Sequence, residues 1–353
     1  MIMRRRNFIK NSALAAATLS FDFPKVKNKS KEKLLSAYYF RAHMYTMVPR
    51  QVREDLQWMA DLGTDAVCPA IIEQDLFAAV ENMDIICNEA EKLGMKVFAV
   101  PSRWAGLIAG APKVPSIFTI QNPNTYAMHE NGKPFTSSVS GRISSFYHPK
   151  TVRFFKDAID KMMELWPIAG ITWDEPKVYG DLDYSQAARE ALGNQINKDR
   201  HNKAFSDFWS ELNKHIKENH PSVSTHFFIQ AKAWKKPNVL KHSSQISHLD
   251  YYGCDGRPWY IKDGGQLESE GKVLLGEEQG EVFLDLAKKN GKKSLWLIEN
   301  HNMAMADAQL MDKRMPEIME KDVDHLIYYY YPRNLEDPDK IMNIMASHLK
   351  KWK

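Results

Sequence analysis

From about residue 34 onward, hydrophobic and polar positions alternate along the chain in two repeating patterns. Short runs rich in β-branched and aromatic residues are each followed by a longer segment in which hydrophobic residues recur every three to four positions. The first pattern predicts a buried strand and the second an amphipathic helix. The chain contains eight strand candidates, at residues 34–40, 64–71, 96–102, 170–175, 223–230, 248–254, 294–300 and 325–332.

Helical patterns separate and follow these strands. The first of them begins at Pro49, which suits a first helical turn, and ends at Gly63, which suits a C-cap. Pro316 interrupts one segment and predicts a poor helix there, and the crossover at 231–247 has no clear apolar stripe. The helical segments span residues 49–63, 75–94, 151–166, 200–221, 280–291, 311–324 and 337–352.

This alternation predicts a fold of the α/β class. Strands separated by helices form a parallel sheet, and eight repeats predict a closed (β/α)8 barrel, the TIM barrel, as a single domain over residues 34–353. An open doubly wound sheet is the alternative, but it usually carries a Gly-rich turn after its first strand, and "YYFRAHMY" has none. Long loops follow the third, fourth and sixth strands, at the end of the strands where barrel active sites lie.

Residues 1–33 have a different character. Three arginines, Arg4 to Arg6, precede Phe8-Ile9-Lys10 and a short Ala-rich stretch, and the pair Arg5-Arg6 looks like a bacterial twin-arginine export signal. This resemblance predicts a periplasmic or secreted protein; a disordered basic tail on a cytoplasmic protein is the alternative. The apolar stretch is much shorter than the roughly 20 residues of a membrane span, so no stable membrane insertion is expected.

Composition narrows the function classes. The 353 residues, 44% hydrophobic and 26% charged, are typical of a globular protein. The net charge of +4 is too small and too dispersed to indicate a nucleic-acid partner. Cys68, Cys87 and Cys254 are widely spaced, which indicates neither a disulfide framework nor a Cys-x-x-Cys metal site. We expect no cofactor and no metal.

Carboxylates stand at the ends of two predicted strands. Asp174 and Glu175 close the fourth strand in "GITWDEPK", and Glu299 closes the seventh in "LWLIENHN". Side-chain alternation predicts that Trp173 and Glu175 share one side of the strand and Asp174 takes the other. Acids on different strands meet at a barrel mouth, and glycoside hydrolysis needs such a pair. A helix N-cap or a loop salt bridge is the alternative role for each acid.

The two strand ends resemble those of a known group of enzymes. "DEP" after strand four and "EN" after strand seven look like the retaining (β/α)8 glycoside hydrolases of clan A, which implies Glu175 as acid/base and Glu299 as nucleophile, with Asp174 where the clan usually has Asn. The segment ending in "GITWDEP" is also similar to that of bacterial glycosidase barrels. Analogy to α-glycosidases of the fucosidase-like and galactosidase-like kind implies instead that Asp174 attacks and that Glu299 or Asp255 supplies the acid.

Further residues near the strand ends predict a carbohydrate ligand. Sugar faces stack on flat rings, and sugar hydroxyls pair with charged and amide groups. The candidate substrate-binding residues are His43, Tyr45, Arg103, Trp104, Gln230, Trp234, Tyr252, Asp255, Arg257, Asn300, His301, Tyr331 and Arg333.

The sequence therefore predicts an exported hydrolase of carbohydrate metabolism that acts on O-glycosyl bonds. Two other classes stay open. A metal-dependent sugar isomerase or epimerase would recruit acids and histidines from several strands, here His226, Asp255, Glu299 and His301. A carbohydrate-binding barrel without catalytic activity would use the same aromatic residues.

Overall fold

A computed structural model describes most of the chain after residue 32. The described residues are 33–40, 47–110, 113–193, 195–229, 233, 235–259, 262–263, 266–267 and 274–352. The predicted export signal lies outside them.

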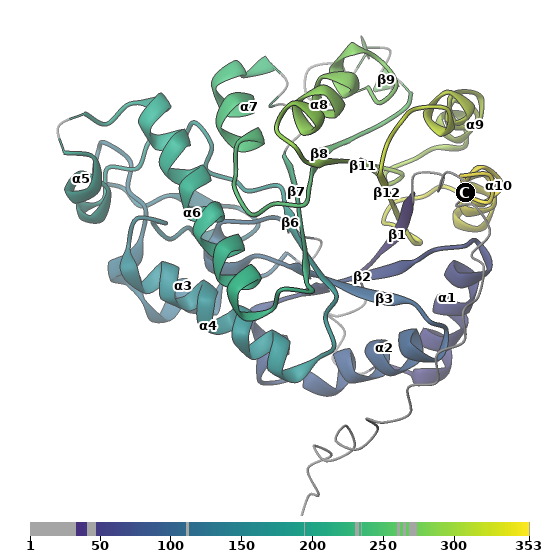
Figure 1. Ribbon diagram of the computed structural model, residues 1–353, viewed down its shortest axis with the longest axis horizontal. Coiled ribbons are helices and arrows are strands. Elements are labelled where there is room, and N and C mark those ends of the chain that lie inside the picture. The colour runs from purple at the N-terminus through teal and green to yellow at the C-terminus, as the bar shows by residue number, and fades with distance from the viewer. Residues whose placement is uncertain are drawn as a thin grey trace, which may run out of the picture. The chain divides into compact units, whose positions relative to one another are not determined.

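Eight parallel strands close into a barrel, as the sequence predicts (Figure 1). β1 pairs with both β2 and β12, so the sheet has no free edge and the open doubly wound alternative is wrong. The barrel order is β1-β12-β11-β8-β7-β6-β3-β2. The strands are β1 (Leu34–Tyr39), β2 (Ala66–Ile71), β3 (Lys96–Pro101), β6 (Gly170–Asp174), β7 (Ser224–Ile229), β8 (Tyr251–Gly256), β11 (Lys293–Ile298) and β12 (His325–Tyr329).

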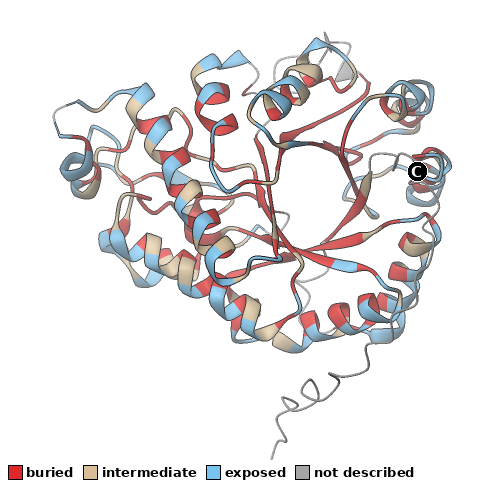
Figure 2. Ribbon diagram, in the orientation of Figure 1, coloured by how far each residue is buried: buried red, intermediate tan, exposed pale blue. Residues whose placement is uncertain are grey.

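Helices surround the barrel, and their apolar faces pack onto the strands (Figure 2). α9 continues through Pro316 to Met319, so the poor helix predicted at this proline was wrong. The weak crossover after β7 contains only the short helix α7. The helices that follow the strands are α1 (Pro49–Asp61), α2 (Val80–Lys92), α4 (Pro149–Leu165), α6 (Lys198–Asn219), α7 (Pro237–Ser244), α8 (Glu278–Lys289), α9 (Met305–Met319) and α10 (Pro338–Leu349).

Alternation along each strand divides the core into two parts. On β6, Trp173 points outward and packs on Trp209 of α6, with ring centroids 5.0 Å apart. Tyr38, Phe228 and other inward residues form a separate cluster inside the barrel. Inward positions near the carboxyl ends of the strands therefore face the barrel mouth.

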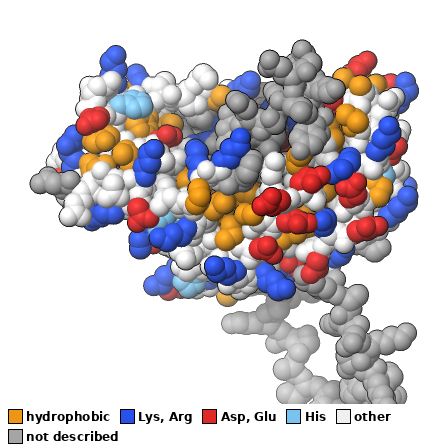
Figure 3. All heavy atoms as spheres, turned by 90° about the horizontal axis from the view of Figure 1, so that it is seen from above, with side chains coloured by type: hydrophobic (Ala, Val, Ile, Leu, Met, Phe, Trp, Pro, Cys, Tyr) orange, Lys and Arg blue, Asp and Glu red, His pale blue; other side chains and the backbone are white. Residues whose placement is uncertain are grey.

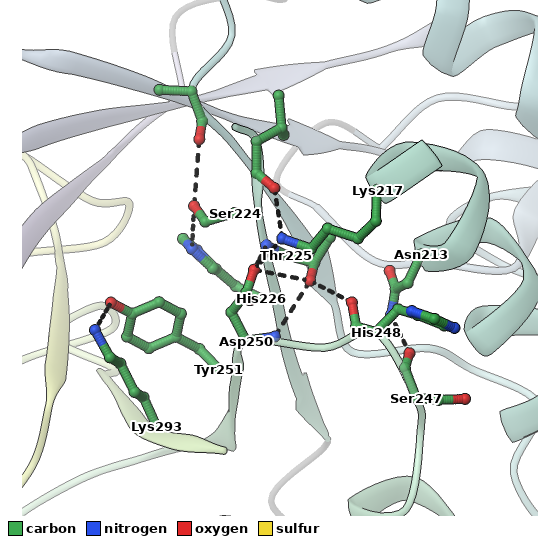
Figure 4. Close-up of polar contacts among 12 residues, drawn as sticks. Asn213, Lys217, Ser224, Thr225, His226, Ser247, His248, Asp250, Tyr251 and Lys293 are labelled. Atoms are coloured by element: carbon green, nitrogen blue, oxygen red, sulfur yellow. Dashed lines mark hydrogen bonds and ion pairs between the residues drawn. The ribbon is translucent and has the colours of Figure 1, made fainter. Parts of the chain in front are cut away.

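Polar side chains also lie at the opposite end of the barrel, where β7 and its neighbours begin; we call this end the floor, and Figure 4 draws the contacts around Ser224, His226 and Asp250. His226 Nε2 lies 2.8 Å from Ser224 Oγ, and Ser36 Oγ lies 2.6 Å from His325 Nε2. Burial lowers the pKa of His226 to about 3, so this ring is neutral. At the rim of the floor Lys217 donates to Asp250 at 2.5 Å. His226 thus lies inside the floor and cannot join Glu299 in the metal site considered above.

The long segment after β3 is an ordered insertion, where it is described. It contains η2 (Trp104–Gly106), α3 (Ile117–Gln121), η3 (Pro123–Thr125) and a hairpin of β4 (Thr136–Ser137) and β5 (Gly141–Arg142). Glu73 of η1 (Glu73–Leu76) anchors it: one carboxylate oxygen accepts from Ser116 Oγ at 2.6 Å and from the Ala105 N–H at 3.0 Å, and the other accepts from the Phe118 N–H at 2.7 Å. The insertion is thereby fixed beside the mouth.

The loops after β6 and β8 also carry structure of their own. The first holds α5 (Gln186–Leu192), and the second holds β9 (Lys262–Asp263) and β10 (Gln266–Leu267). Of the helices that the structure describes, none is both long enough and apolar enough to cross a membrane. The face in Figure 3 carries basic and acidic side chains with small hydrophobic groups between them.

Candidate active site

The end of β6 does not follow the alternation expected from the sequence. Glu175, directly after the strand, has a φ of +42°, a left-handed conformation that residues other than glycine seldom adopt. Its N–H donates to the Phe228 carbonyl of β7 at 3.2 Å. The turn brings the Glu175 carboxylate into the mouth, where it raises the pKa of Asp174. The prediction that these two acids face opposite sides was therefore wrong.

Three carboxylates from three strand ends meet in the mouth. Glu175 after β6, Asp255 on β8 and Glu299 after β11 each offer an oxygen, and these oxygens all lie within 4.8 Å of one another. We call this group the carboxylate triad. Asp255 and Glu299 are buried, while the Glu175 side chain keeps 22% of its surface exposed. Contact with Asp255 is one of the interactions that lower the pKa of Glu175.

Basic side chains surround the triad. Lys177 forms an ion pair with Glu175. Arg257 Nε lies 3.6 Å from one oxygen of Glu299, and His301 Nε2 lies 3.6 Å from the other. Arg257 Nη2 also donates to the His301 carbonyl at 3.1 Å, which ties the two residues together. The mouth thus balances several buried negative charges with fixed positive ones.

The two neighbouring acids of β6 have pKa values displaced in opposite directions. Burial raises the pKa of Asp174 to about 7, with Glu175 and Glu299 adding repulsion and Lys177 and Arg103 opposing it. Burial would also raise the pKa of Glu175, but the charge of Lys177 and the hydrogen bonds from Asp255 and Lys177 outweigh it, so the net shift is downward. One site therefore holds both protonated and ionised carboxyl groups near neutral pH.

Two tyrosines, Tyr38 of β1 and Tyr329 of β12, form an aromatic wall of the mouth. Their rings lie edge to face with centroids 5.2 Å apart. Burial, followed by the charge of Asp174, raises the pKa of both hydroxyls well above the ordinary value. The sequence analysis missed them, although inward alternation on β1 and β12 could have found them. It also missed Lys177, for which the sequence has no signal.

Three predicted substrate-binding residues do not reach the mouth, and these predictions were wrong. Trp104 is fully buried among helix residues and donates from Nε1 to the Ile71 carbonyl at 3.0 Å. Tyr252 faces outward from β8, where its hydroxyl lies 2.8 Å from Ser243 Oγ. The buried Asn300 amide exchanges two hydrogen bonds of 2.9 Å with the Tyr329 backbone, so it joins β11 to β12.

The other predicted residues are placed at or beside the mouth, or lie outside the described part of the chain. Arg103 is tied to the Gly110 carbonyl through Nη2 at 2.5 Å, and its charge acts on Asp174. Tyr331 and Arg333 line a cavity that also includes His301. Four predicted residues lie outside the described ranges: His43, Tyr45, Gln230 and Trp234.

Comparison with known proteins gives the fold. No protein-family model matches the chain, and no curated protein matches it. Among solved structures, the chain is similar to the catalytic domain of a beta-amylase from Paenibacillus polymyxa, with a TM-score of 0.62 and 10% identity over 92% of this chain and 98% of that one. These likenesses establish the barrel fold.

Two further structures support the same conclusion. An endo-1,4-beta-mannanase from Rhizomucor miehei has a TM-score of 0.57 and 12% identity, covering 93% of this chain and 96% of that one. A beta-N-acetylhexosaminidase from Bacteroides fragilis NCTC 9343 has a TM-score of 0.58 and 10% identity, covering 91% and 66%. The predicted TIM barrel is confirmed.

The carboxylate triad has two chemical uses. Carboxyl groups in different protonation states perform acid–base and nucleophilic chemistry on a bound substrate. Three carboxylate oxygens within 4.8 Å of one another are also the ligand type that a divalent cation such as Mg²⁺ or Ca²⁺ takes. In that second use Lys177 and Arg257 would compete with the cation, because each already places a positive charge beside the triad.

Proposed function

We propose that this chain is a glycoside hydrolase that cleaves an O-glycosyl bond at the barrel mouth. The observation that carries the proposal is the carboxylate triad, in which Glu175, Asp255 and Glu299 converge from strands far apart in the sequence to within 4.8 Å. Glycoside hydrolysis requires a protonated carboxyl beside an ionised one, and this pocket holds both.

The spacing favours a retaining mechanism. Retaining glycosidases place the two carboxyl groups roughly 5–5.5 Å apart, and inverting enzymes about 6.5–9.5 Å apart to admit a water molecule. One oxygen of Glu175 and one of Glu299 lie within 4.8 Å of each other, which is shorter than the separation of an inverting pair. The first step is then direct attack by one carboxylate on the anomeric carbon while a second carboxyl gives its proton to the departing oxygen.

Glu299 suits the nucleophile. It is buried, the Arg257 guanidinium places a positive charge 3.6 Å from one of its oxygens, and His301 Nε2 lies 3.6 Å from the other. Attack forms a glycosyl ester on Glu299, which water then hydrolyses to return the free carboxylate.

The hydrogen-bonded pair of Glu175 and Asp255 suits the acid. A proton on Asp255 can pass to Glu175, because the oxygens of the two carboxyl groups lie within 4.8 Å of each other. Glu175 is the more exposed member and is therefore the one that reaches the leaving oxygen. After departure the same pair accepts a proton from the incoming water.

The comparisons add support of a general kind. The amylase, the mannanase and the hexosaminidase that share this fold are all named as enzymes that act on glycosides. A barrel supports many chemistries, so their names raise the expectation of a glycosidase and do not identify the sugar.

Attack by Asp174 is the alternative within the same class. Its pKa of about 7, raised first by burial, leaves much of it protonated near neutral pH, which suits a nucleophile poorly. Asp174 is better placed to modulate the charge of Glu175.

The proposal is tested with purified variants on a panel of aryl glycosides. Glu299→Gln and Glu175→Gln should each lower kcat/KM by at least about 10³-fold on a substrate that the parent cleaves, while Asp174→Asn should lose less. Glu164→Gln, on the exposed end of α4, is the matched control and should keep full activity. Full activity in both triad variants would refute the proposal, and so would sugar binding with no turnover of any glycoside by the parent.

A cation-dependent enzyme is the second candidate, because the triad also offers three oxygen ligands. Dialysis against EDTA separates the two. Turnover that survives chelation supports the hydrolase, whereas activity that disappears and returns only with Mg²⁺, Mn²⁺ or Ca²⁺ supports the cation site.

A further inference from the structure

A cavity of about 740 Å³ opens beside the carboxylate triad, between the ends of β1 and β12. Most of its lining is aromatic, with Tyr38, Phe40, Tyr329 and Tyr331 among the walls. We call it the tyrosine cavity. Its volume is ample for a pyranose ring, and flat aromatic rings are the surfaces on which sugar faces stack.

The tyrosine cavity and the triad share a wall. His301 lines the cavity and also lies 3.6 Å from Glu299. Tyr38 and Tyr329 line it too, and the charge of Asp174 acts on both hydroxyls. A sugar bound in the cavity would therefore be adjacent to a sugar held at the triad.

Two buried polar atoms of the cavity residues have no hydrogen-bond partner in the described part of the chain. Tyr38 Oη and His301 Nδ1 are buried, and neither makes a hydrogen bond with any residue that the structure describes. Such atoms are costly in a folded protein unless a ligand or water satisfies them. Sugar hydroxyls, which both donate and accept, would satisfy an O–H and a ring nitrogen.

The cavity also presents a guanidinium that its neighbours do not neutralise. Arg333 is exposed, and no carboxylate of the described residues forms an ion pair with it. The cations near the triad, by contrast, pair with its acids. Asp55, the acid that lines the cavity, accepts hydrogen bonds from the hydroxyls of Tyr39 at 2.7 Å and Tyr330 at 2.8 Å.

Arg103 strengthens the positive field in this region. Its pKa is lowered, first by burial and in part by repulsion from Arg333, so the two guanidinium groups act on each other. An anion on a bound ligand would relieve that repulsion.

We propose that the tyrosine cavity is a second sugar subsite, and that it takes a ring carrying a carboxylate or sulfate group, which Arg333 binds. Tyr331 offers a stacking face, and Tyr38 Oη and His301 Nδ1 bind hydroxyls. The inference rests on the proposed function: it names the substrate class as acidic oligosaccharides, with the anionic ring next to the cleaved bond.

Equilibrium binding tests the subsite apart from catalysis. The Glu299→Gln protein is titrated by calorimetry with oligogalacturonides and their methyl esters, and with sulfated galactan oligosaccharides and their desulfated forms. Within at least one pair, we expect the anionic probe to bind about tenfold or more tightly than its neutral counterpart, and the pair that responds identifies the anion. Adding Arg333→Gln should abolish that preference and Arg333→Lys should restore part of it. Arg153→Gln, on the exposed face of α4, is the matched control.

Equal affinity for charged and neutral probes, failure to bind any probe, or a preference that survives Arg333→Gln would overturn the inference. Its failure is separable from that of the proposed function. Hydrolysis of aryl glycosides without a charge preference leaves the hydrolase standing and removes the acidic subsite. A charge preference that depends on Arg333, in a protein that hydrolyses no glycoside, supports the acidic subsite and removes the hydrolase.

Discussion

Asp174 is a carboxyl group that burial in the barrel makes harder to ionise than an ordinary aspartate. Burial raises its pKa to about 7, while in the unfolded chain an aspartate has a pKa of about 4. The folded protein therefore binds this proton more tightly than the unfolded chain does. The stability linked to it is fully present below about pH 4 and is lost as the pH rises through about 7.

Asp174→Asn should remove this pH dependence. Between pH 4 and pH 8, the free energy of unfolding of the variant should rise relative to the parent by about 2–4 kcal/mol, because Asn has no charge to bury. Urea unfolding curves at both pH values measure it, with Asp157→Asn on the exposed face of α4 as control. Parallel behaviour of all three proteins would contradict the buried neutral carboxyl.

The end of β6 also shows where the prediction of single side-chain directions fails. The sequence placed Asp174 and Glu175 at a strand end in the mouth but put them on opposite sides, because alternation assumes an extended backbone. Glu175 instead has a φ of +42°. The residues beside Glu175 in the sequence do not predict a left-handed turn. The contacts that accompany this turn come from Asp255, which is on another strand, and from Lys177.

Among the elements, the short helix η1 holds the insertion after β3 in place. Its residue Glu73 is buried and accepts three hydrogen bonds from the insertion after β3, the segment that also carries Arg103. A single side chain thus connects the end of β2 to a loop beside the mouth.

Glu73→Ala should loosen this insertion. Leaving three donors without an acceptor should cost about 3 kcal/mol of unfolding free energy, and amide hydrogen exchange should accelerate across residues 103–148. Glu130→Ala, an exposed change in the same insertion, should do neither. Unchanged exchange in the Glu73 variant would show that the insertion is held by other contacts.

The bounds of the strands were predicted better than the directions in which their side chains point. Each of the eight strands lies within three residues of its predicted bounds, because apolar runs and helical periodicity are local signals. Tyr252 was assigned to the mouth because it stands near a strand end, yet it points to the helices. The predicted run stopped at residue 254, whereas β8 continues to Gly256, and that shift decides which residues reach the mouth.

For the molecule as a whole, closure of the barrel is what gathers the acids. Glu175 and Glu299 are more than a hundred residues apart in sequence, and only a cylinder brings both strand ends to one opening. The barrel and the meeting of these two acids were predictable from the eightfold repeat. The tyrosine cavity was not, because it depends on how the ends of β1 and β12 pack.

Substitution of Gly253 tests the close packing of strands that closes the barrel. A Cβ at this position would lie 1.6 Å from the Leu295 carbonyl oxygen of β11, so Gly253→Ala must push two barrel strands apart. We expect a loss of at least about 3 kcal/mol of unfolding free energy or failure to fold. Gly291→Ala, at a φ of +67° with open space around the added carbon, should cost only about 1 kcal/mol. Similar costs for the two variants would contradict the close β8–β11 contact.

The measurement that tests the central claim most directly is covalent trapping at the mouth. The protein is incubated with a panel of 2-deoxy-2-fluoro glycosides that carry a dinitrophenolate leaving group, and the labelled peptide is identified by mass spectrometry. The proposed mechanism predicts one sugar attached to Glu299. Attachment to Asp174 or Glu175, or turnover of the matching substrates with inversion and no label, would contradict it.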